Sequence, residues 1–385
     1  MFALHPLFNP TAGDLMSGPA LQKLQIHNVR NLQLVEIPQL QRINVFYGRN
    51  GSGKTSILEA IHLLGMARSF RGSIKSLITH GERSCTVFGS VESPVTPGGL
   101  PLGVQRETSG EVKIKIGGKS VRTVAQLVEH LPLQVINADS FDLLTGSPNA
   151  RRQYLDWGVF HVEHRFFDQW QRFQRSIKQR NKLLRRGKIS SEELSVWTRD
   201  LATSGTALNE YRIAYFKLLT PRFKAIMAQL VPSLQGLELR YRQGWDKQIN
   251  YAAALENSTS SDTEQGYTHV GPQRADIRVM TDGHLAADTL SRGQQKLVVC
   301  GLKLAQGQLI SELGHGKCTY LVDDLPSELD QQHSELVCQQ LNAMEAQVFI
   351  TCVHSRDIAS VWPKQEDTNL AMFHVEHGEI NVDSA

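Results

Sequence analysis

Residues 42–64 read RINVFYGRNGSGKTSILEAIHLL, and this stretch decides the fold class of the chain. An apolar run of strand character comes first, the loop Gly48-x-x-x-x-Gly53-Lys54-Thr55 follows, and an apolar-periodic helix comes last. Glycines let the loop backbone curl so that its N–H groups point inward at phosphate oxygens. The helix presents the positive end of its dipole to the same anion. The stretch therefore predicts a phosphate-binding loop in an α/β fold.

The loop residues suit a nucleotide and its metal ion. Lys54 would reach the β- and γ-phosphates of ATP, and the hydroxyl of Thr55 would ligate Mg²⁺. A chance glycine turn is the alternative, but the strand, the loop, the Lys-Thr pair and the helix all occur in the required order. The residues expected to contact ATP here are Gly48, Arg49, Asn50, Gly51, Ser52, Gly53, Lys54 and Thr55.

The metal ion needs a carboxylate from elsewhere in the chain, and the segment TYLVDD supplies one. This segment and QVFIT, further on, both read as buried strands. Asp323 would hold Mg²⁺ directly or through water, and Asp324 would polarise the attacking water. An acidic pair in a turn is the alternative when the segment is taken alone. Taken together with the phosphate loop, the segment TYLVDD predicts Lys54, Asp323 and Asp324 as the catalytic residues.

A second helix start suited to an anion lies in the segment TLSRGQQK, residues 289–296. Ser291 is a favourable N-cap, and Gly293 allows close approach of a ligand. Any capped helix has a similar sequence. The prediction that this helix start binds an anion therefore depends on its position shortly before the acidic strand end. Ser291, Gly293 and Gln294 are the residues expected to contact nucleotide.

Residues 166–186 predict an amphipathic helix. The apolar residues of one sector are Phe166, Trp170, Phe173, Ile177 and Leu184. The opposite side carries a basic stripe of Arg172, Arg175, Lys178, Lys182, Arg185 and Arg186. The stripe could contact the phosphates of DNA, or it could be the solvated face of an ordinary surface helix, and the pattern leaves both open. Gly187 is expected to end the helix.

These motifs resemble those of the ATP-binding-cassette ATPases of genome maintenance, which include SMC proteins. The S-x-G-Q motif at residues 291–294, the acidic strand end and Ser327-Glu-Leu-Asp330 are typical of that superfamily. Further segments make the chain similar to the RecF family, and the similarity runs from about residue 21 to residue 380. They are Val29-Arg30-Asn31, ARSFR at 67–71, GSPNARR at 146–152, Leu155-Asp156, GPQRAD at 271–276 and FHVEHG at 373–378.

The resemblance implies an α/β fold with an ATP-binding-cassette type P-loop ATPase head, a mixed sheet with flanking helices, and an inserted helical lobe. Residues 1–20 would form a disordered N-terminal extension, and residues 21–156 would form the part of the head that carries the loop. Residues 157–265 would form the helical lobe with the basic stripe, of which the polar stretch 257–265 reads as a linker or loop. Residues 266–385 would complete the head with the signature motif and the Walker B strand.

The resemblance also implies an ATP-dependent DNA-binding protein of recombinational repair and replication-fork maintenance. Such a protein would have double-stranded and single-stranded DNA as partners. It would form a homodimer with ATP on double-stranded or gapped DNA, with Ser291 of one copy facing the ATP held by Lys54 of the other. It would hydrolyse ATP slowly, as a DNA-dependent switch, and with RecO and RecR it would promote RecA loading on single-stranded DNA. Asp330 would signal across the dimer interface. The nucleotide-binding subunit of a membrane transporter is the alternative.

Some roles stay open in the sequence. Thr351 or His354, in VFITCVH, could be the switch residue beside the γ-phosphate. Gln134 could couple the nucleotide to the next lobe, or it could be a structural residue of a strand. Arg152 could contact phosphate, or it could pair with an acidic residue such as Asp156.

Composition limits the class of protein. The net charge is only +3, so any attraction for DNA must be concentrated locally. The cysteines are odd in number, scattered and without a C-x-x-C pair, which favours a reducing, cytoplasmic location over a disulfide or zinc framework. No apolar run is long enough to span a membrane, so no membrane partner is expected. The chain could start at Met1 or at Met16.

Overall fold

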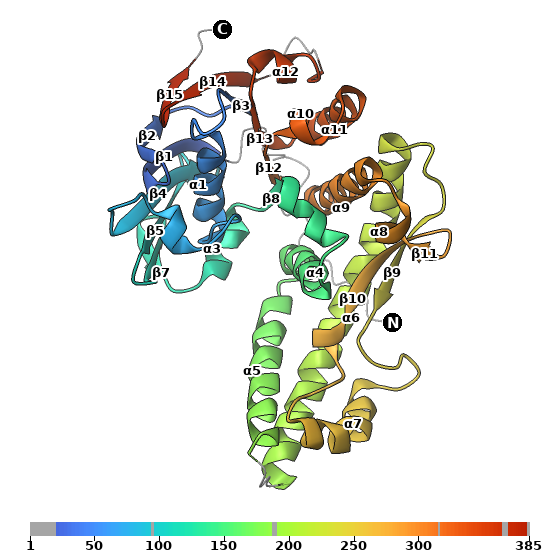
Figure 1. The fold of residues 1–385 in the computed structure, drawn as a ribbon. Coiled ribbons are helices and arrows are strands. Elements are labelled where there is room, and N and C mark those ends of the chain that lie inside the picture. The colour runs from blue at the N-terminus through green and yellow to red at the C-terminus, as the bar shows by residue number, and fades with distance from the viewer. Residues whose placement is uncertain (1–20, 94–95, 187–190, 315, 364–368, 383–385) are drawn as a thin grey trace. The chain divides into compact units, whose positions relative to one another are not determined.

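The computed structural model describes residues 21–93, 96–186, 191–314, 316–363 and 369–382. The expected N-terminal extension and Gly187 lie outside these residues. The chain forms two compact units: one contains residues 1–138 and 310–385, and the other contains residues 139–309 (Figure 1). The boundaries expected after residues 156 and 265 differ from this division, because the helix that follows the S-x-G-Q motif packs with the second unit up to residue 309.

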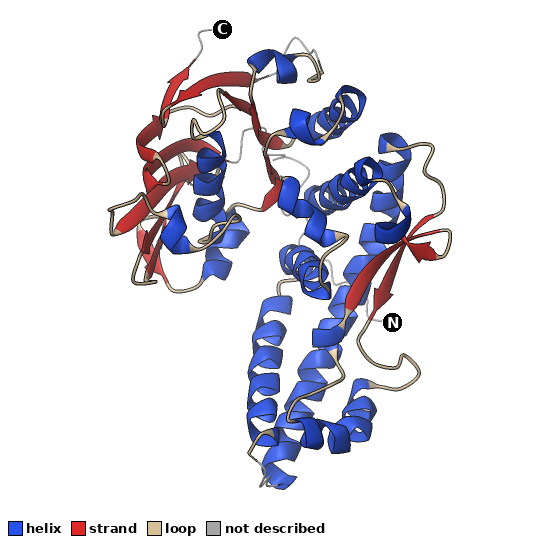
Figure 2. Ribbon diagram, viewed as in Figure 1, coloured by secondary structure: helices blue, strands red, loops and turns tan. Residues whose placement is uncertain are grey.

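A six-stranded, mostly parallel sheet forms the centre of the first unit (Figure 2). Its order is β15 (Glu379–Val382), β14 (Leu370–Glu376), β3 (Ile43–Tyr47), β13 (Gln347–Cys352), β12 (Thr319–Val322) and β8 (Leu133–Ile136). Only β15 pairs antiparallel to its neighbour. Both β12 and β13 are buried throughout, which confirms the two buried strands predicted from sequence. Parallel order brings the carboxyl ends of β3, β12 and β13 to the same edge of the sheet.

A second, antiparallel sheet of the same unit packs with the first around α1 (Lys54–Met66). Its order is β2 (Leu32–Ile37), β1 (Leu21–Val29), β4 (Ser84–Val91), β5 (Leu100–Glu107), β6 (Val112–Ile116) and β7 (Lys119–Val121). Apolar side chains of both sheets and of α1 form one continuous core. The shorter helices of the unit are α2 (Ile74–Leu77), α3 (Val124–His130), α10 (Leu325–Glu328), α11 (Gln331–Ala343) and α12 (Ser355–Ala359).

The second unit is mainly helical. It follows a 3-10 turn, η1 (Ala138–Leu143), and it contains α4 (Pro148–Val162), α5 (Phe166–Leu184), α6 (Ser191–Leu230), α7 (Tyr251–Gln265), η2 (Pro272–Arg274), α8 (Ala286–Thr289) and most of α9 (Arg292–Glu312). A small antiparallel sheet has the order β11 (His284–Leu285), β10 (Asp276–Thr281) and β9 (Leu237–Arg242). Helices α5 and α6 lie side by side over most of the length of α5 (Figure 1).

Helix α5 has the predicted amphipathic character. Phe166, Phe173 and Leu184 are buried, and Trp170 and Ile177 are partly buried. All members of the basic stripe are exposed. The stripe therefore lies on the surface of the second unit, as a contact with an external polymer would require.

The expectation of a linker or loop at residues 257–265 is wrong, because these residues form the second half of α7. The side chain of Asn250 caps the start of α7 by accepting from the amide of Ala253 at 2.8 Å. Gly266 ends it with φ 76°. Asp262 is buried and accepts from Arg180 of α5 at 2.7 Å. A buried ion pair thus anchors the polar second half of α7, whereas Tyr251, Ala254 and Leu255 are buried in its first half.

Removing the Asp262 carboxylate should destabilise the second unit strongly. Asp262→Ala leaves the fully buried Arg180 without its counter-charge, so the free energy of unfolding should fall by about 3–5 kcal/mol. Urea denaturation followed by circular dichroism measures the change. Glu264→Ala removes an exposed carboxylate from the same helix and should cost less than about 0.5 kcal/mol. Equal stability of the two variants would contradict the anchor.

Candidate nucleotide-binding site

The predicted phosphate loop lies between β3 and α1, and its glycines are required by its backbone. Gly48, Gly51 and Gly53 have φ values of 149°, 81° and 120°, a region that side chains other than glycine rarely enter. A Cβ added to Gly48 would lie 2.2 Å from the carbonyl oxygen of Val375 in β14. The loop is therefore tightly fitted against the neighbouring strand.

The side chain of Lys54 lies over this loop. It is only 8% exposed, and its Nζ donates to the carbonyl oxygens of Gly48 at 2.6 Å and Arg49 at 3.0 Å. Burial lowers the pKa of the Lys54 ammonium, while the nearby Asp324 and Asp323 carboxylates oppose that change. A partly desolvated cation held above curled backbone amides is well suited to bind the phosphates of a nucleotide.

The structure brings Thr55 and Asp323 together, although they lie far apart in the sequence. The Thr55 hydroxyl donates to Asp323 Oδ1 at 2.9 Å, and the Thr351 hydroxyl of β13 donates to the same oxygen at 2.7 Å. Burial raises the pKa of the Asp323 carboxyl, and these two hydrogen bonds and the charge of Arg71 act against that increase. One hydroxyl and one carboxylate thus lie beside Lys54, in the arrangement that a P-loop protein uses for Mg²⁺.

Asp324 begins the turn after β12 in an unusual conformation. Its φ of 54° lies in the left-handed region, and its amide donates to the Thr351 hydroxyl at 2.9 Å. Thr351 therefore contacts both members of the acidic pair. His354, the other candidate switch residue, is exposed at the start of α12, where its amide donates to Asp357 at 3.1 Å. Of the two candidates, Thr351 contacts the acidic pair directly.

In the part of the chain that the structure describes, no group of three or more His, Cys, Asp or Glu side chains could hold a metal ion. Thr55 and Asp323 alone would supply few protein ligands. This is the usual condition for Mg²⁺, which is commonly held by one or two carboxylates together with phosphates and water. The residues present therefore fit a metal ion that arrives with its nucleotide.

Asn31 braces the loop, a role that the sequence pattern does not reveal. Its side-chain amide donates to the carbonyl oxygen of Ser52 at 3.0 Å, and its side-chain oxygen accepts from the hydroxyl of Ser56 at 2.9 Å. The amide of Gly378 donates to the same Ser52 oxygen at 2.8 Å. The preceding residue, Arg30, pairs with the buried Glu59 of α1 at 2.8 Å. The motifs at 29–31 and 373–378 thus support the loop from two sides.

The predicted signature helix starts as expected. Ser291 and Gln294 form a reciprocal cap of α9: the Gln294 amide donates to the Ser291 hydroxyl at 3.3 Å, and the Ser291 amide donates to the Gln294 side-chain oxygen at 3.0 Å. Ser291 and Gly293 are exposed, and a Cβ added to Gly293 would meet no atom within 4 Å. The helix start belongs to the second unit, whereas the phosphate loop belongs to the first.

The RR and GPQRAD motifs meet in a structural cluster of the second unit. Arg151 binds Asp276 through two hydrogen bonds of 2.7 and 3.3 Å, and Arg152 donates to the carbonyl oxygen of Ala275 at 3.0 Å. Asp156 does not hydrogen-bond to Arg152: it accepts from Arg212 of α6 at 2.8 and 2.9 Å. No local pattern points to Arg212, because its partner lies in another helix.

Two other candidates have local structural roles. Gln134 is buried in β8, paired with Tyr320 of β12. Asp330 caps α11 by accepting from the amide of His333 at 2.9 Å and from its ring nitrogen at 2.7 Å. These hydrogen bonds lower the pKa of Asp330.

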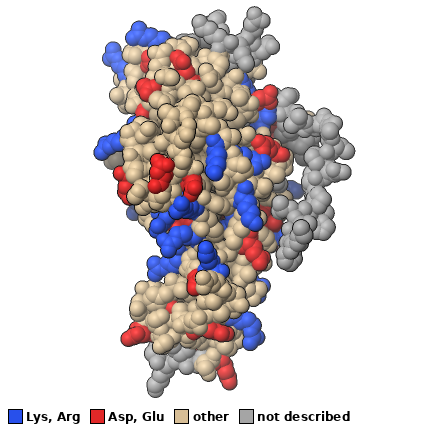
Figure 3. Space-filling model, turned by 90° about the vertical axis from the view of Figure 1, so that its right-hand side faces the viewer, with Lys and Arg blue, Asp and Glu red and all other residues tan. Residues whose placement is uncertain are grey.

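The charge of the basic stripe is partly balanced. Arg172 forms an ion pair with Asp200 of α6. Lys and Arg side chains lie among Asp and Glu side chains on the face shown in Figure 3, which agrees with the small net charge. The other members of the stripe carry its uncompensated positive charge toward solvent.

Known proteins of similar sequence establish the family. The family model described as RecF/RecN/SMC N terminal domain matches residues 20–381. A protein from Stutzerimonas stutzeri (strain A1501), named DNA replication and repair protein RecF, is 51% identical over 362 residues, which cover 94% of this chain and 97% of the relative. A protein of the same name from Pseudomonas syringae pv. tomato is 50% identical, over 94% of this chain and 98% of its own length.

The chain belongs to the RecF family.

Solved structures confirm the predicted fold class. A structure described as the recombination mediator protein RecF-ATPrS in the RecFOR pathway matches with a TM-score of 0.82 at 24% identity, and it covers 95% of this chain and 99% of that one. The SMC head bound to the C-winged helix domain of ScpA matches with a TM-score of 0.55 at 16% identity, over 95% and 98% of the two chains. The described helices of this RecF-family chain include none that is long and apolar enough to cross a membrane.

Thr351 should be a positioning residue for the acidic pair. Thr351→Val keeps the side-chain volume but removes the hydroxyl, so Asp323 loses a donor and the Asp324 amide loses its acceptor. The free energy of unfolding should fall by about 1–3 kcal/mol, the cost of a buried polar group without a partner. The affinity for ATP with Mg²⁺, measured by calorimetric titration, should fall as well.

Thr351→Ser is the matched control, because it keeps the hydroxyl and loses only a methyl group. It should retain the affinity for ATP with Mg²⁺ even if its stability falls. An affinity equal to that of the wild type in Thr351→Val would show that Thr351 does not position the acidic pair.

Proposed function

We propose that the chain acts in recombinational DNA repair and replication as an ATP-dependent DNA-binding protein. The observation that carries the proposal is the hydrogen bond between Thr55 and Asp323 beside the buried Lys54, on a glycine-shaped loop. This arrangement supports binding of ATP with Mg²⁺. In it, Lys54 and the loop amides would hold the phosphates, and Thr55 and Asp323 would hold the metal ion.

Asp324 is the proposed residue for polarising the attacking water. Its position directly after the metal-binding Asp323 supports this role, and its left-handed backbone turns it away from the strand direction. Aspartate is shorter than glutamate, so its carboxylate reaches less far toward the water. We therefore expect slow ATP hydrolysis, suited to a DNA-dependent switch.

The second half of the proposal is a homodimer that forms with ATP. The exposed start of α9, with Ser291 and Gly293, offers a hydroxyl, backbone amides and a helix dipole to an anion. In the proposed dimer this helix start contacts the ATP on the loop of a second copy. Nucleotide binding would then stabilise the dimer through mass action, and hydrolysis would release it.

The proposed pathway is inferred from the names of similar proteins. The curated relatives are named DNA replication and repair protein RecF, and two solved relatives are described as recombination mediators in the RecFOR pathway, one with ATP and one with ATPrS. By that similarity, we propose RecO and RecR as partners, loading of RecA on single-stranded DNA as the outcome, and the cytoplasm as the place of action. The transporter alternative has no support among these relatives.

ATP-driven dimerisation can be tested by analytical ultracentrifugation. The wild type should be a monomer without nucleotide and a dimer with ATP, Mg²⁺ and duplex DNA. Lys54→Met removes the phosphate-binding cation and should stay monomeric. Lys119→Met, which removes an exposed lysine from edge strand β7, should dimerise like the wild type. A dimer that forms equally well without ATP would contradict the switch.

The basic stripe should contribute to DNA affinity by binding phosphates. Reversing the charge of Arg175, Lys178 and Lys182 to Glu should weaken duplex binding. The slope of log affinity against log salt should become shallower by about 1 for each phosphate that the variant no longer binds. Fluorescence anisotropy at several salt concentrations measures both quantities.

A variant with Lys217, Lys224 and Lys247 changed to Glu carries the same charge change at exposed sites elsewhere in the second unit. It should bind DNA more tightly than the stripe variant, and both should bind ATP like the wild type. If the stripe variant binds DNA with wild-type affinity, the stripe is not the DNA-binding surface.

A further inference from the structure

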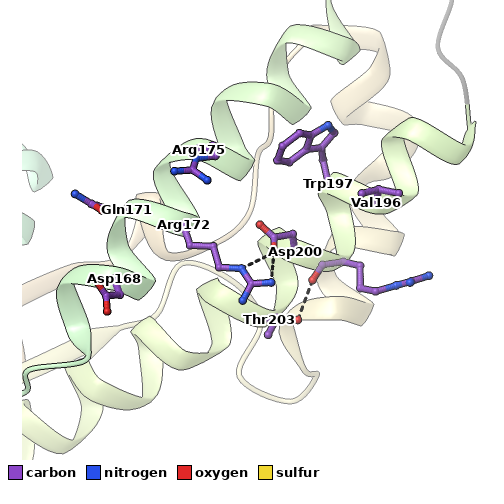
Figure 4. Close-up of a pocket in the computed structure, with 9 residues that line it drawn as sticks. Asp168, Gln171, Arg172, Arg175, Val196, Trp197, Asp200 and Thr203 are labelled. Atoms are coloured by element: carbon purple, nitrogen blue, oxygen red, sulfur yellow. Dashed lines mark hydrogen bonds and ion pairs between the residues drawn. The ribbon is translucent and has the colours of Figure 1, made fainter.

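A groove lies between α5 and α6 of the second unit, and it shares Arg172 and Arg175 with the basic stripe. It encloses about 590 Å³, within the range of roughly 300–1,000 Å³ that is usual for ligand-binding pockets. Its walls include Arg172 and Arg175 from α5, and Val196, Trp197 and Asp200 from α6 (Figure 4).

The aromatic part of the groove is open. Trp197 is partly exposed, and it has no ring contact or hydrogen bond to another residue that the structure describes. The adjacent Val196 is 60% exposed. The groove thus offers an indole ring and an aliphatic side chain to a ligand.

The charge of the groove favours an anion. Arg172 reaches across to Asp200, which also accepts from the Ser176 hydroxyl, so the Asp200 charge is balanced (Figure 4). Within the described residues, the guanidinium groups of Arg175 and Arg199 form no hydrogen bond or ion pair. Asp168 is the remaining acidic side chain of the lining. The three arginines and two carboxylates of the lining leave the groove with one net positive charge.

The lining residues follow the axes of α5 and α6, so the groove runs along the two helices. Residues 168–175 of α5 and 196–203 of α6 each span about 10 Å, since a helix rises about 1.5 Å per residue. Asp168 lies at one end of the α5 segment, and Arg175 lies at the other. Beyond Arg175, the exposed Lys178 and Lys182 continue the basic stripe along the same helix. An anionic chain could therefore leave the groove over a continuous basic track.

We propose that this groove binds single-stranded DNA, with one base stacked on Trp197 and the adjoining phosphate at Arg175. Grooves that combine a basic track with an open aromatic ring are typical of single-strand binding, because each base presents a face for stacking. At about 3.4 Å per stacked nucleotide, 10 Å accommodates roughly three nucleotides. A duplex keeps its bases stacked inside, so it can contact the stripe but not the indole ring. The inference rests on the proposed DNA binding and assigns it a single-strand site.

The test compares binding of a fluorescein-labelled oligothymidylate and of a labelled duplex of equal length by fluorescence anisotropy, with the full-length chain. Trp197→Ala should weaken oligothymidylate binding by about 5- to 150-fold, the range for loss of one base–aromatic stack. Its duplex affinity should stay within about twofold of the wild type, because a duplex leaves the indole untouched. Trp197→Phe keeps a stacking ring and should retain most of the single-strand affinity, which also controls for folding.

Arg175→Ala should weaken both DNA forms, whereas Lys224→Ala, an exposed lysine further along α6, should weaken neither. Equal single-strand affinity in Trp197→Ala and the wild type overturns the groove site. If Trp197→Ala loses affinity equally for single-stranded and duplex DNA, stacking of a base on the indole ring is overturned.

If Trp197→Ala binds both DNA forms like the wild type but binds labelled polyglutamate more weakly, the groove is a site for acidic peptides instead. A wild type that binds neither DNA form overturns the proposed function itself, so the two failures can be told apart.

Discussion

The hydrogen bonds of Thr55 and Thr351 to one shared oxygen of Asp323 are the constraint on which the rest of the structure depends. They join the start of α1, the end of β12 and the end of β13 at one edge of the parallel sheet. Each of these chain segments is fixed by its own local packing, but only the sheet order brings them together. The same edge holds Lys54 against the loop carbonyls. The fold alone thereby arranges the residues proposed to bind the metal ion and the phosphates.

Ion pairs add to the apolar interior of the second unit. Arg180 with Asp262 anchors α7, Arg212 with Asp156 joins α4 to α6, and Arg151 with Asp276 joins α4 to β10. Buried pairs of this kind cost desolvation, and they are favourable only when their hydrogen bonds are well formed. These pairs join α5 to α7 and α4 to both α6 and β10. Arg172 and Asp200 pair across the groove that α5 and α6 form beside Trp197.

Local patterns in the sequence are sufficient to predict the helices, strands and loop that form the site. The loop and α1, the buried strands β12 and β13, the Ser291 cap and the amphipathic α5 all depend on residues close together in the chain. Long-range partners were not predictable from such patterns. The polar end of α7 resembles a loop in sequence because its anchor, Arg180, lies in α5. The pairing of Asp156 with Arg212 has no local sequence signal for the same reason. Asn31 carried no local sign that it braces the phosphate loop.

The Mg²⁺ dependence of ATP affinity tests the metal-binding pair most directly. It can be measured by calorimetric titration of the wild type and Asp323→Asn, with Mg²⁺ present and after chelation. Mg²⁺ should tighten ATP binding to the wild type, and this advantage should disappear in Asp323→Asn, because the amide is a poor substitute for the carboxylate. Equal affinity of the wild type with and without Mg²⁺, or an undiminished advantage in the variant, would contradict the assignment of Thr55 and Asp323 as the metal-binding pair.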